Sequence, residues 1–224
     1  MNAISYVAAS GCQRRTLPSC YPHGNTVHRY HLKWSENGIW ERVCARLRAK
    51  VGGQEARDVE PSAGVIDARG VRGASTVTGA TRGYGPGKKI SGRNTFGVVD
   101  TLGLLVPVIV VAASVSDNAG GIAVVHPARN RSSRLAKTWW GGGFKQAFMA
   151  GCWAHHISAE VVNKIHARRF EVLPRRWVIE RTWSWLMDNR RLQVDDERNP
   201  AVTEFFWVAH SRLLLRRLTE PAIW

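Results

Sequence analysis

The feature that most constrains the fold is an apolar stretch near the middle of the chain. The segment 95–100 (TFGVVD) is followed by a turn at Thr101–Gly103 and then by the segment 104–111 (LLVPVIVV). Two such runs joined by a short turn that contains glycine predict a β-hairpin. The second run is apolar at nearly every position, which indicates a strand covered on both faces, while Pro107 marks a bulge or a sheet edge.

The segments around this hairpin predict a mixed α/β order. A short apolar run, Val65-Ile66, ends at Asp67, and a second strand is expected to end at the triple glycine 141–143. No clear pattern covers residues 117–134. Further helices are predicted over 160–169, 175–189 and 201–218. In this order, an acid at the end of a strand can meet an acid on a nearby helix.

The first sixty residues have a helical pattern of their own. Helices are predicted over 26–34 and 39–51, with a polar, glycine-containing turn at 35–38 between them. Two interpretations fit this pair of helices equally well. One is a helix-turn-helix that reads DNA, and the other is a helical hairpin that packs on the rest of the chain. The segment 52–62 has the composition of a linker. We therefore expect a helical DNA-binding-like module over residues 1–60 and a second domain over 61–224.

The charge of the chain points to a polyanionic partner. A formal net charge of +15 over 224 residues makes nucleic acid the commonest candidate. No apolar stretch has the roughly 18 to 20 residues of a membrane span, because the longest candidate, 102–113, is shorter and contains Pro107. The start lacks the pattern of a secretion signal, and the four cysteines are scattered. A reducing, cytoplasmic setting is expected.

One cysteine lies near three histidines, in a pattern that invites a zinc interpretation. Cys20 and His23 are followed by His28 and His31. The loop between the two pairs is far shorter than in the usual zinc fingers, so a zinc site is not the favoured interpretation.

The most unusual residue of the predicted helix 175–189 is a single carboxylate among arginines and tryptophans. Trp177, Arg181 and Ser184 share a helix face with Glu180 at spacings of three and four residues. One interpretation is an ion pair of Glu180 with Arg176 or Arg181. The other is a metal-binding carboxylate beside a guanidinium that binds phosphate, a pairing used in phosphodiester chemistry. Both interpretations remain open at this point.

Several motifs, in order, resemble the catalytic core of insertion-sequence transposases of the DDE type, of the insertion-sequence-five-like family. They are Asp67 after its strand, Arg82-Gly83-Tyr84, Lys88-Lys89, Gly92-Arg93, the segment 98–104 (VVDTLGL), the segment 174–182 (PRRWVIERT) and Arg190-Arg191-Leu192. The N-terminal region also resembles the family's helical leader, at positions that include Trp34, Gly38 and 60–63 (EPSA). The resemblance therefore covers nearly the whole chain.

The resemblance implies a fold and an activity. The fold is a ribonuclease H-like mixed sheet flanked by helices, and the activity is the binding of terminal inverted repeats, strand cleavage, and joining of the freed ends to target DNA. In such enzymes carboxylates hold two divalent ions about 3.5 to 4 Å apart. Oxygen ligands favour Mg²⁺ or Mn²⁺. Asp67 and Glu180 would be the catalytic and metal-binding acids here, and Arg176 falls on the family's arginine position.

The sequence departs from the family at the second aspartate. Gly141 stands where that carboxylate is expected, and glycine brings neither a ligand nor a charge. We therefore expect catalysis to be lost or very weak. The family's lysine position falls on Met187, which leaves Arg190 or Arg191 as substitutes, and Arg14 stands where the family has tryptophan. With a start that looks short for the family, these departures suggest a truncated or degenerate copy.

Other acids are expected to have structural roles, and other cations are expected to contact DNA. Asp100 and Asp117 match family positions outside the catalytic triad, and turn or cap roles are favoured for both. The residues expected to bind DNA are Lys88, Lys89, Arg93, Arg175, Arg176, Arg181, Arg190 and Arg191. The expected partner is double-stranded DNA, both of the inverted repeats and of the target, and the chain could bind it as a homodimer. No membrane association is expected, and the expected location is the cytoplasm, in association with the nucleoid.

Two other functional classes are set against the transposase. The first is a DNA-binding protein without chemistry, which occupies the element ends and competes with active transposase. The second is a basic ribosome-associated protein, which leaves the ordered acid-bearing segments unexplained. Tryptophans 177, 183 and 185 are expected to pack the last helices against the sheet rather than to stack on bases.

Overall fold

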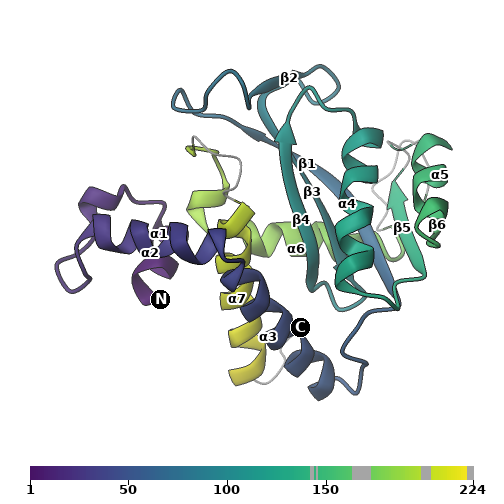
Figure 1. The fold of residues 1–224 in the computed structure, drawn as a ribbon, viewed down its shortest axis with the longest axis horizontal. Helices are drawn as coiled ribbons and strands as arrows, with labels where there is room; N and C mark the ends of the chain where they lie inside the picture. The colour runs from purple at the N-terminus through teal and green to yellow at the C-terminus, as the bar shows by residue number, and fades with distance from the viewer. Residues whose placement is uncertain (142–143, 145, 163–172, 198–202, 221–224) are drawn as a thin grey trace.

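The structure is a computed structural model that describes residues 1–141, 144, 146–162, 173–197 and 203–220. Helices and strands follow one another along the chain in the order seen in Figure 1. The elements are α1 (Asn2–Ser10), η1 (Arg14–Thr16), α2 (Gly24–Glu36), α3 (Ile39–Gln54), β1 (Ala63–Arg72), β2 (Gly83–Gly85), β3 (Ile90–Asp100), β4 (Leu105–Ala112), α4 (Asp117–Arg131), β5 (Lys137–Gly141), α5 (Gln146–Ala154), β6 (Ser158–Val162), α6 (Trp177–Met187), η2 (Arg190–Leu192) and α7 (Thr203–Thr219).

The strands of the described residues form one mixed sheet. Its order is β2-β3-β1-β5-β6, and β4 also pairs with β3. The strands β1, β3 and β4 are antiparallel neighbours, whereas β5 runs parallel to both β1 and β6. A three-stranded antiparallel meander extended by two parallel strands, with helices on both faces, is the ribonuclease H-like fold. The fold class expected from the sequence is therefore confirmed.

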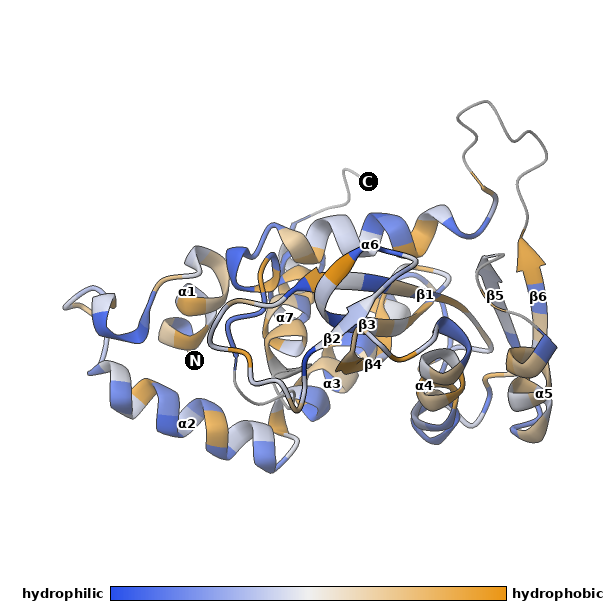
Figure 2. Cartoon of the chain, turned by 90° about the horizontal axis from the view of Figure 1, so that it is seen from above, coloured by the Kyte–Doolittle hydropathy of each residue, from blue (hydrophilic) through white to orange (hydrophobic). Residues whose placement is uncertain are grey.

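Each face of the sheet has its own hydrophobic core. Successive side chains of a strand point to opposite faces, so Val65 of β1 lies in one core and Ile66 in the other. The first core contains residues of α6 and α7, and the second contains residues of α4 and α5. Figure 2 shows α6 on one side of the sheet and α4 with α5 on the other. Helices on both faces cover the central strands, as the apolar run 104–111 predicts.

Two glycines allow α4 to lie close to its neighbours. A Cβ atom on Gly120 would lie 2.1 Å from the ring of Phe96 on β3. A Cβ atom on Gly121 would lie 2.4 Å from the ring of Phe144. Both contacts are far inside van der Waals distance, so this face of α4 has no room for larger side chains. Ser116 caps the helix, because its hydroxyl accepts the N–H of Ala119.

The N-terminal helices share a core with the end of the chain. Trp40 and Cys44 of α3 are fully buried, and the thiol of Cys44 donates a hydrogen bond to the carbonyl of Trp207 on α7. Arg48 of α3 is also buried and donates to the carbonyl of Leu105 on β4. This packing is what the helical-hairpin interpretation of the segment requires. The division of the chain at residue 60 stays a prediction.

Most predicted elements are present, and several regions differ. The strand expected to end at Asp67 continues to Arg72, because its pairing with β3 extends that far. The hairpin of β3 and β4 is confirmed, and the β3–β4 register shifts between Gly97 and Val99, so that the ladder carries the expected irregularity. The helix expected over 160–169 is wrong at its start, since Ser158–Val162 is the strand β6; the rest of it lies outside the described residues. The unassigned segment 117–134 is largely α4, and α5 was not predicted. Within the described part of the chain, no helix has the length and apolar character required to cross a bilayer.

Candidate active site

The first expected acid lies on the central strand of the sheet. Asp67 of β1 is paired with Gly97 of β3 in the antiparallel register. On its other side, β1 runs parallel to β5 with Val65 opposite Trp139. Asp67 comes two residues after Val65, and Gly141 comes two residues after Trp139. Positions 67 and 141 therefore lie side by side on neighbouring strands and on the same face of the sheet. A side chain at Gly141 would therefore point to the same side as the carboxylate of Asp67.

The second expected acid lies on the helix that crosses this face. Glu180 is in the first turn of α6, which begins after Arg176. The Nη2 atom of Arg176 lies 3.7 Å from Oδ1 of Asp67 and 3.4 Å from Oε1 of Glu180. The two carboxylates therefore meet at one guanidinium, although 112 residues separate them along the chain. The ion pair of Glu180 with Arg176, one of the two interpretations of this helix, is present.

The same guanidinium occupies the space beside Gly141. A Cβ atom on Gly141 would lie 2.6 Å from Nη1 of Arg176 and 2.7 Å from its Cζ. Atoms do not approach this closely, so a side chain at position 141 requires Arg176 to move. The contact involves the far end of a flexible side chain rather than backbone, which makes such a movement inexpensive. Arg176 thus stands in contact with all three positions at which the family resemblance expects a carboxylate.

The surroundings of Asp67 make its charged form less favourable than it is in water. Burial raises the pKa of the Asp67 carboxyl above its usual value, and the positive charge of Arg176 opposes this shift without cancelling it. The side chain of Asp67 is 22% exposed, whereas that of Glu180 is 58% exposed. Asp67 is therefore the more deeply buried of the two acids.

The donor set does not fit a two-ion centre. Nowhere in the described residues do three or more His, Cys, Asp or Glu side chains gather as they would around a metal ion. At the site itself two carboxylates converge, and a cation of the chain already lies between them. Two divalent ions need more anionic oxygen ligands than two carboxylates supply. The side chains of Cys20, His23, His28 and His31, all within the described residues, do not gather in this way either.

One cation next to the site was missed in the sequence. Arg69 follows Asp67 by two residues on β1 and therefore points to the same face. Its Nη1 atom contacts the sulfur of Met187, the residue at the family's lysine position, and lies 3.5 Å from the carbonyl of Leu192. The motif around Asp67 contained no signal for this residue, because the contact joins β1 to the distant end of α6.

A further acid on this face was also missed. Glu160 of β6 is paired in register with Trp139 of β5 and accepts a hydrogen bond from its indole Nε1. Its carboxylate lies 2.7 Å from Lys137 Nζ and 3.5 Å from Arg175 Nη1. Glu160 was expected in a helix, so its place at the edge of the sheet was not anticipated. Its hydrogen bonds with Lys137 and Trp139 lower the pKa of this carboxyl, with Lys137 the larger cause.

Of the two acids expected to be structural, one has the expected turn role. Asp100 is buried at the end of β3, and its Oδ1 accepts the N–H groups of Leu102 and Leu104 in the hairpin turn. Asp117 is the first residue of α4 and forms an ion pair with Lys88 at 3.0 Å. The environment of Asp100 raises its pKa because of burial. Asp100 therefore has the expected turn role, whereas Asp117 is not the cap of α4: Ser116 is the cap, and Asp117 pairs with a lysine 29 residues away.

The cations expected to bind DNA have different surroundings. Lys89, Arg175 and Arg190 are exposed. Arg181 is sandwiched between the rings of Trp177 and Trp185, at 4.4 and 4.5 Å from their centroids. Lys88 pairs with Asp117, as described above. Trp183 is buried against the sheet as expected, whereas Trp177 is 40% exposed. Whether any of these cations binds DNA stays a prediction.

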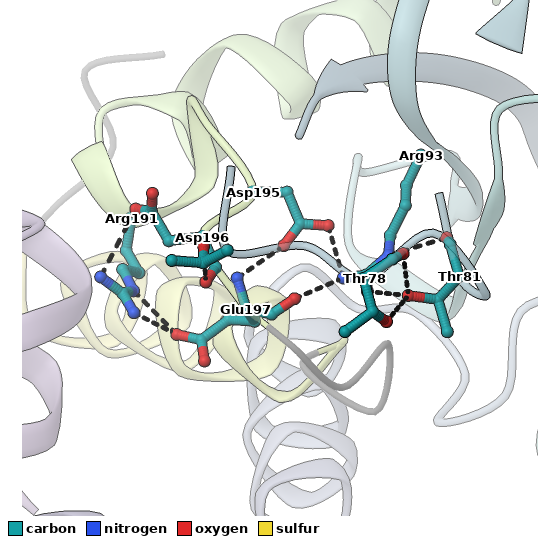
Figure 3. A network of polar contacts seen from close by, with 8 residues as sticks. Thr78, Thr81, Arg93, Arg191, Asp195, Asp196 and Glu197 are labelled. Carbon is teal, nitrogen blue, oxygen red and sulfur yellow. Dashed lines mark hydrogen bonds and ion pairs between the residues drawn. The ribbon is translucent and has the colours of Figure 1, made fainter. Parts of the chain in front are cut away.

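Two other arginines of that set belong to an acidic network (Figure 3). Arg93 of β3 is 1% exposed, and its Nη1 lies 2.7 Å from Oδ2 of Asp195. Arg191 pairs with Glu197 and lies 3.5 Å from Asp196. Arg93 also donates to the backbone carbonyl of Glu197 and to the hydroxyl of Thr81. In this arrangement Arg93 lies inside the protein, where its role is to attach the segment after η2 to the sheet.

Comparisons with known proteins agree with the geometry. Residues 59–215 match the family model described as the transposase DDE domain, and residues 1–44 match the model described as putative transposase of the IS4/5 family. No curated protein matches the chain. The matched range contains Asp67, Gly141 and Glu180, the three positions that surround Arg176. A ribonuclease H-like sheet, two acids that converge on its central strand, and a family match over most of the chain lead to one conclusion: this chain belongs to the DDE transposases, of the IS4/5 type.

Proposed function

We propose that this chain binds the terminal inverted repeats of its insertion sequence and that its DNA cleavage and strand transfer are lost or very weak. The loss of cleavage and strand transfer is inferred from the surroundings of Gly141. At this position the chain has no carboxylate, and the guanidinium of Arg176 takes up the adjacent space. Members of the DDE family generally use divalent metal ions, and in an intact member Mg²⁺ or Mn²⁺ would activate the attacking oxygen and stabilise the leaving one.

The roles of the remaining residues follow from their places. Asp67 and Glu180 are the proposed metal-binding and catalytic acids that persist. Arg176 keeps them close to each other, and Arg69 with Arg175 provides positive charge on the same face. A DNA strand laid over this face would meet these cations with its phosphates. The proposed DNA contacts also include Lys88, Lys89, Arg181, Arg190 and Arg191.

We propose the N-terminal residues 1–60 as a second DNA-contacting part, and residues 61–224 as the catalytic domain. Arg42, Arg46 and Lys50 are exposed on α3, while Trp40, Cys44 and Arg48 of the same helix are buried. A helix with one buried face and one basic exposed face can be laid along a DNA duplex. Action as a homodimer on DNA, and association with the nucleoid, form part of this proposal.

The test of the lost chemistry is a nicking assay with three proteins. The substrate is duplex DNA that carries the element's ends, incubated with Mg²⁺ or Mn²⁺. We expect background nicking for the unmodified chain and an increase of at least about 10-fold for Gly141→Asp, because removal of even an outer metal partner typically costs about 10- to 100-fold. Gly141→Asn is the matched control, since it adds the same volume without a charge. Robust nicking by the unmodified chain would contradict the proposal.

The alternative function is a DNA-binding protein without chemistry that occupies the element ends. It is favoured by the same site, because the positive charge of Arg176 already balances one of the two negative charges of the remaining acids. Under this alternative Gly141→Asp binds the element ends but stays at background in the nicking assay. Binding is measured separately by fluorescence anisotropy with an end-containing duplex and with a duplex of scrambled sequence. Equal affinity for the two duplexes would remove the element-end specificity that both functions require.

A further inference from the structure

Two carboxylates surround the guanidinium of Arg176, and this arrangement does not depend on DNA binding. The side chain of Arg176 is 19% exposed, and its guanidinium lies between the carboxylates of Asp67 and Glu180, at 3.7 and 3.4 Å. These are ion-pair distances rather than hydrogen-bond distances, so charge is the main component of the interaction. On its other side, Nη1 fills the space next to Gly141. A cation of the chain thus sits among the positions that would surround a metal ion.

We propose that the guanidinium of Arg176 serves as the resident cation of this site, in place of a divalent metal ion. The charge count supports this. Two carboxylates and one guanidinium leave a net charge of −1, whereas the two carboxylates alone would have −2, the value that one divalent ion neutralises. An unpaired carboxylate that is mostly removed from water is unfavourable, and a nearby cation relieves this. With Arg176 in place, a divalent ion gains little and must displace a bound cation.

The backbone before α6 directs this side chain toward the sheet. Arg175 has a positive φ of 68°, a conformation that non-glycine residues rarely adopt. The turn is held by a hydrogen bond from the N–H of Arg176 to the carbonyl of Pro174, at 2.8 Å. As a result, the two consecutive arginines diverge. Arg175 lies over the ring of Trp139 and reaches Glu160, whereas Arg176 reaches Asp67. This divergence makes Arg175 a matched control for Arg176.

The glycine at position 141 is part of the same arrangement. Only glycine leaves the space that Nη1 and Cζ of Arg176 occupy, because any Cβ there would lie within 2.7 Å of both atoms. The absence of a side chain at position 141 and the position of the Arg176 guanidinium therefore depend on each other. The guanidinium reduces the negative charge of the site without a metal ion, and it leaves the site unsuited to holding two divalent ions.

The test compares the effect of Mn²⁺ on the full chain and on two variants. Thermal unfolding is followed with increasing Mn²⁺, and bound Mn²⁺ is counted by electron paramagnetic resonance. For the unmodified chain and for Arg175→Met, we expect no Mn²⁺-dependent shift of the midpoint. Arg176→Met should unfold at lower temperature without metal. It should then gain roughly 5 to 10 °C when Mn²⁺ is present at about 100 times its dissociation constant.

A second substitution identifies the ligands. In the double variant Arg176→Met with Asp67→Asn, one carboxylate and the guanidinium are both absent, and the Mn²⁺ response should disappear. The proposal is overturned if Arg176→Met shows no more Mn²⁺ response than the unmodified chain. It is also overturned if the unmodified chain binds Mn²⁺ at micromolar concentration and loses that binding in Asp67→Asn. The latter measurement needs no Arg176 variant, so it decides the matter even if Arg176→Met does not fold. None of these readouts uses DNA or nicking, so this inference and the proposed function can fail separately.

Discussion

The guanidinium of Arg69 on β1 contacts the sulfur of Met187 at the end of α6. Met187 occupies the position at which the family resemblance expects a lysine, so the positive charge missing from the helix is present on the neighbouring strand. Burial lowers the pKa of the Arg69 side chain, yet an arginine remains charged at neutral pH. The sequence alone suggested Arg190 or Arg191 as substitutes; Arg191, however, is engaged by Glu197.

Substitution Arg69→Gln should weaken DNA binding and reduce its salt dependence. If Arg69 neutralises one phosphate, the slope of log K against log salt should fall in magnitude by about one, with a similar loss for every duplex sequence. Fluorescence anisotropy between low and moderate NaCl measures the slope. The control is Arg134→Gln, an exposed arginine that pairs with Asp58 before β5 begins. An unchanged slope for Arg69→Gln would show that this guanidinium does not contact phosphate.

Substitution Asp195→Asn should destabilise the fold through Arg93. The two side chains are 2.7 Å apart and 1% and 12% exposed, so the variant removes a negative charge that pairs with a buried guanidinium (Figure 3). Removing one member of a buried pair typically costs about 3 to 5 kcal/mol. Urea unfolding measures this free energy. Glu220→Gln, which affects the exposed pair with Arg216, should change it by less than about 1 kcal/mol. Similar small effects for both would refute the role given to Arg93.

Two buried histidines should make the protein less stable in mild acid. Burial is the main cause that lowers the pKa of His210 to about 3 and of His31 to about 4. In the unfolded chain these groups take up protons near the ordinary value of 6.5, whereas the folded chain resists protonation until far lower pH. Stability is therefore retained above this value and is lost as pH falls from about 6.5 toward the folded pKa values, by up to about 1.4 kcal/mol per pH unit for each histidine.

The substitution that isolates one of these groups is His210→Gln. The Nε2 atom of His210 accepts the N–H of Leu105 at 3.1 Å, and a glutamine amide oxygen can replace it as acceptor. Urea unfolding at a series of pH values between 7 and 4 should show a shallower loss of stability for His210→Gln than for the unmodified chain. The matched control is His126→Gln, which removes an exposed imidazole. An equal slope in all three proteins would exclude His210 as a source of the acid sensitivity.

The turn between β3 and β4 should tolerate no side chain at Gly103. This residue has φ +83°, and a Cβ atom would lie 2.8 Å from Oγ1 of Thr182, which donates to the carbonyl of Gly103 itself. Gly103→Ala should therefore cost about 1 to 3 kcal/mol from its backbone conformation alone. Gly53→Ala is the opposite case, since Gly53 lies in α3 with nothing within 4 Å, and it should stabilise by about 0.5 to 1 kcal/mol. Thermal unfolding of the two variants should give shifts of opposite sign.

Local patterns were enough to predict several elements, and their failures have physical causes. The hairpin of β3 and β4 and the helix around Glu180 have strong periodic patterns with clear turn or proline signals. The helix α4 was obscured by Gly120 and Gly121, which disfavour helix in isolation but are required by the close rings of Phe96 and Phe144. The strand β6 is only five residues long and begins SAE, which resembles a helix start. Its strand conformation depends on pairing with β5, a separate segment of the chain that the local sequence of β6 does not reveal.

The sequence by itself determined which chemical groups are available at the site: the acids Asp67 and Glu180, the arginines beside them, and a glycine at the position of the expected second acid. The sequence determines these groups because each is the residue type at a single position, and each lies within one motif. Only the tertiary structure decided that Arg176 lies between the two acids and against Gly141, and that Arg69 meets Met187. These contacts join β1, β5 and α6 across the sheet face, and such distances are set by strand pairing and helix packing rather than by any local pattern.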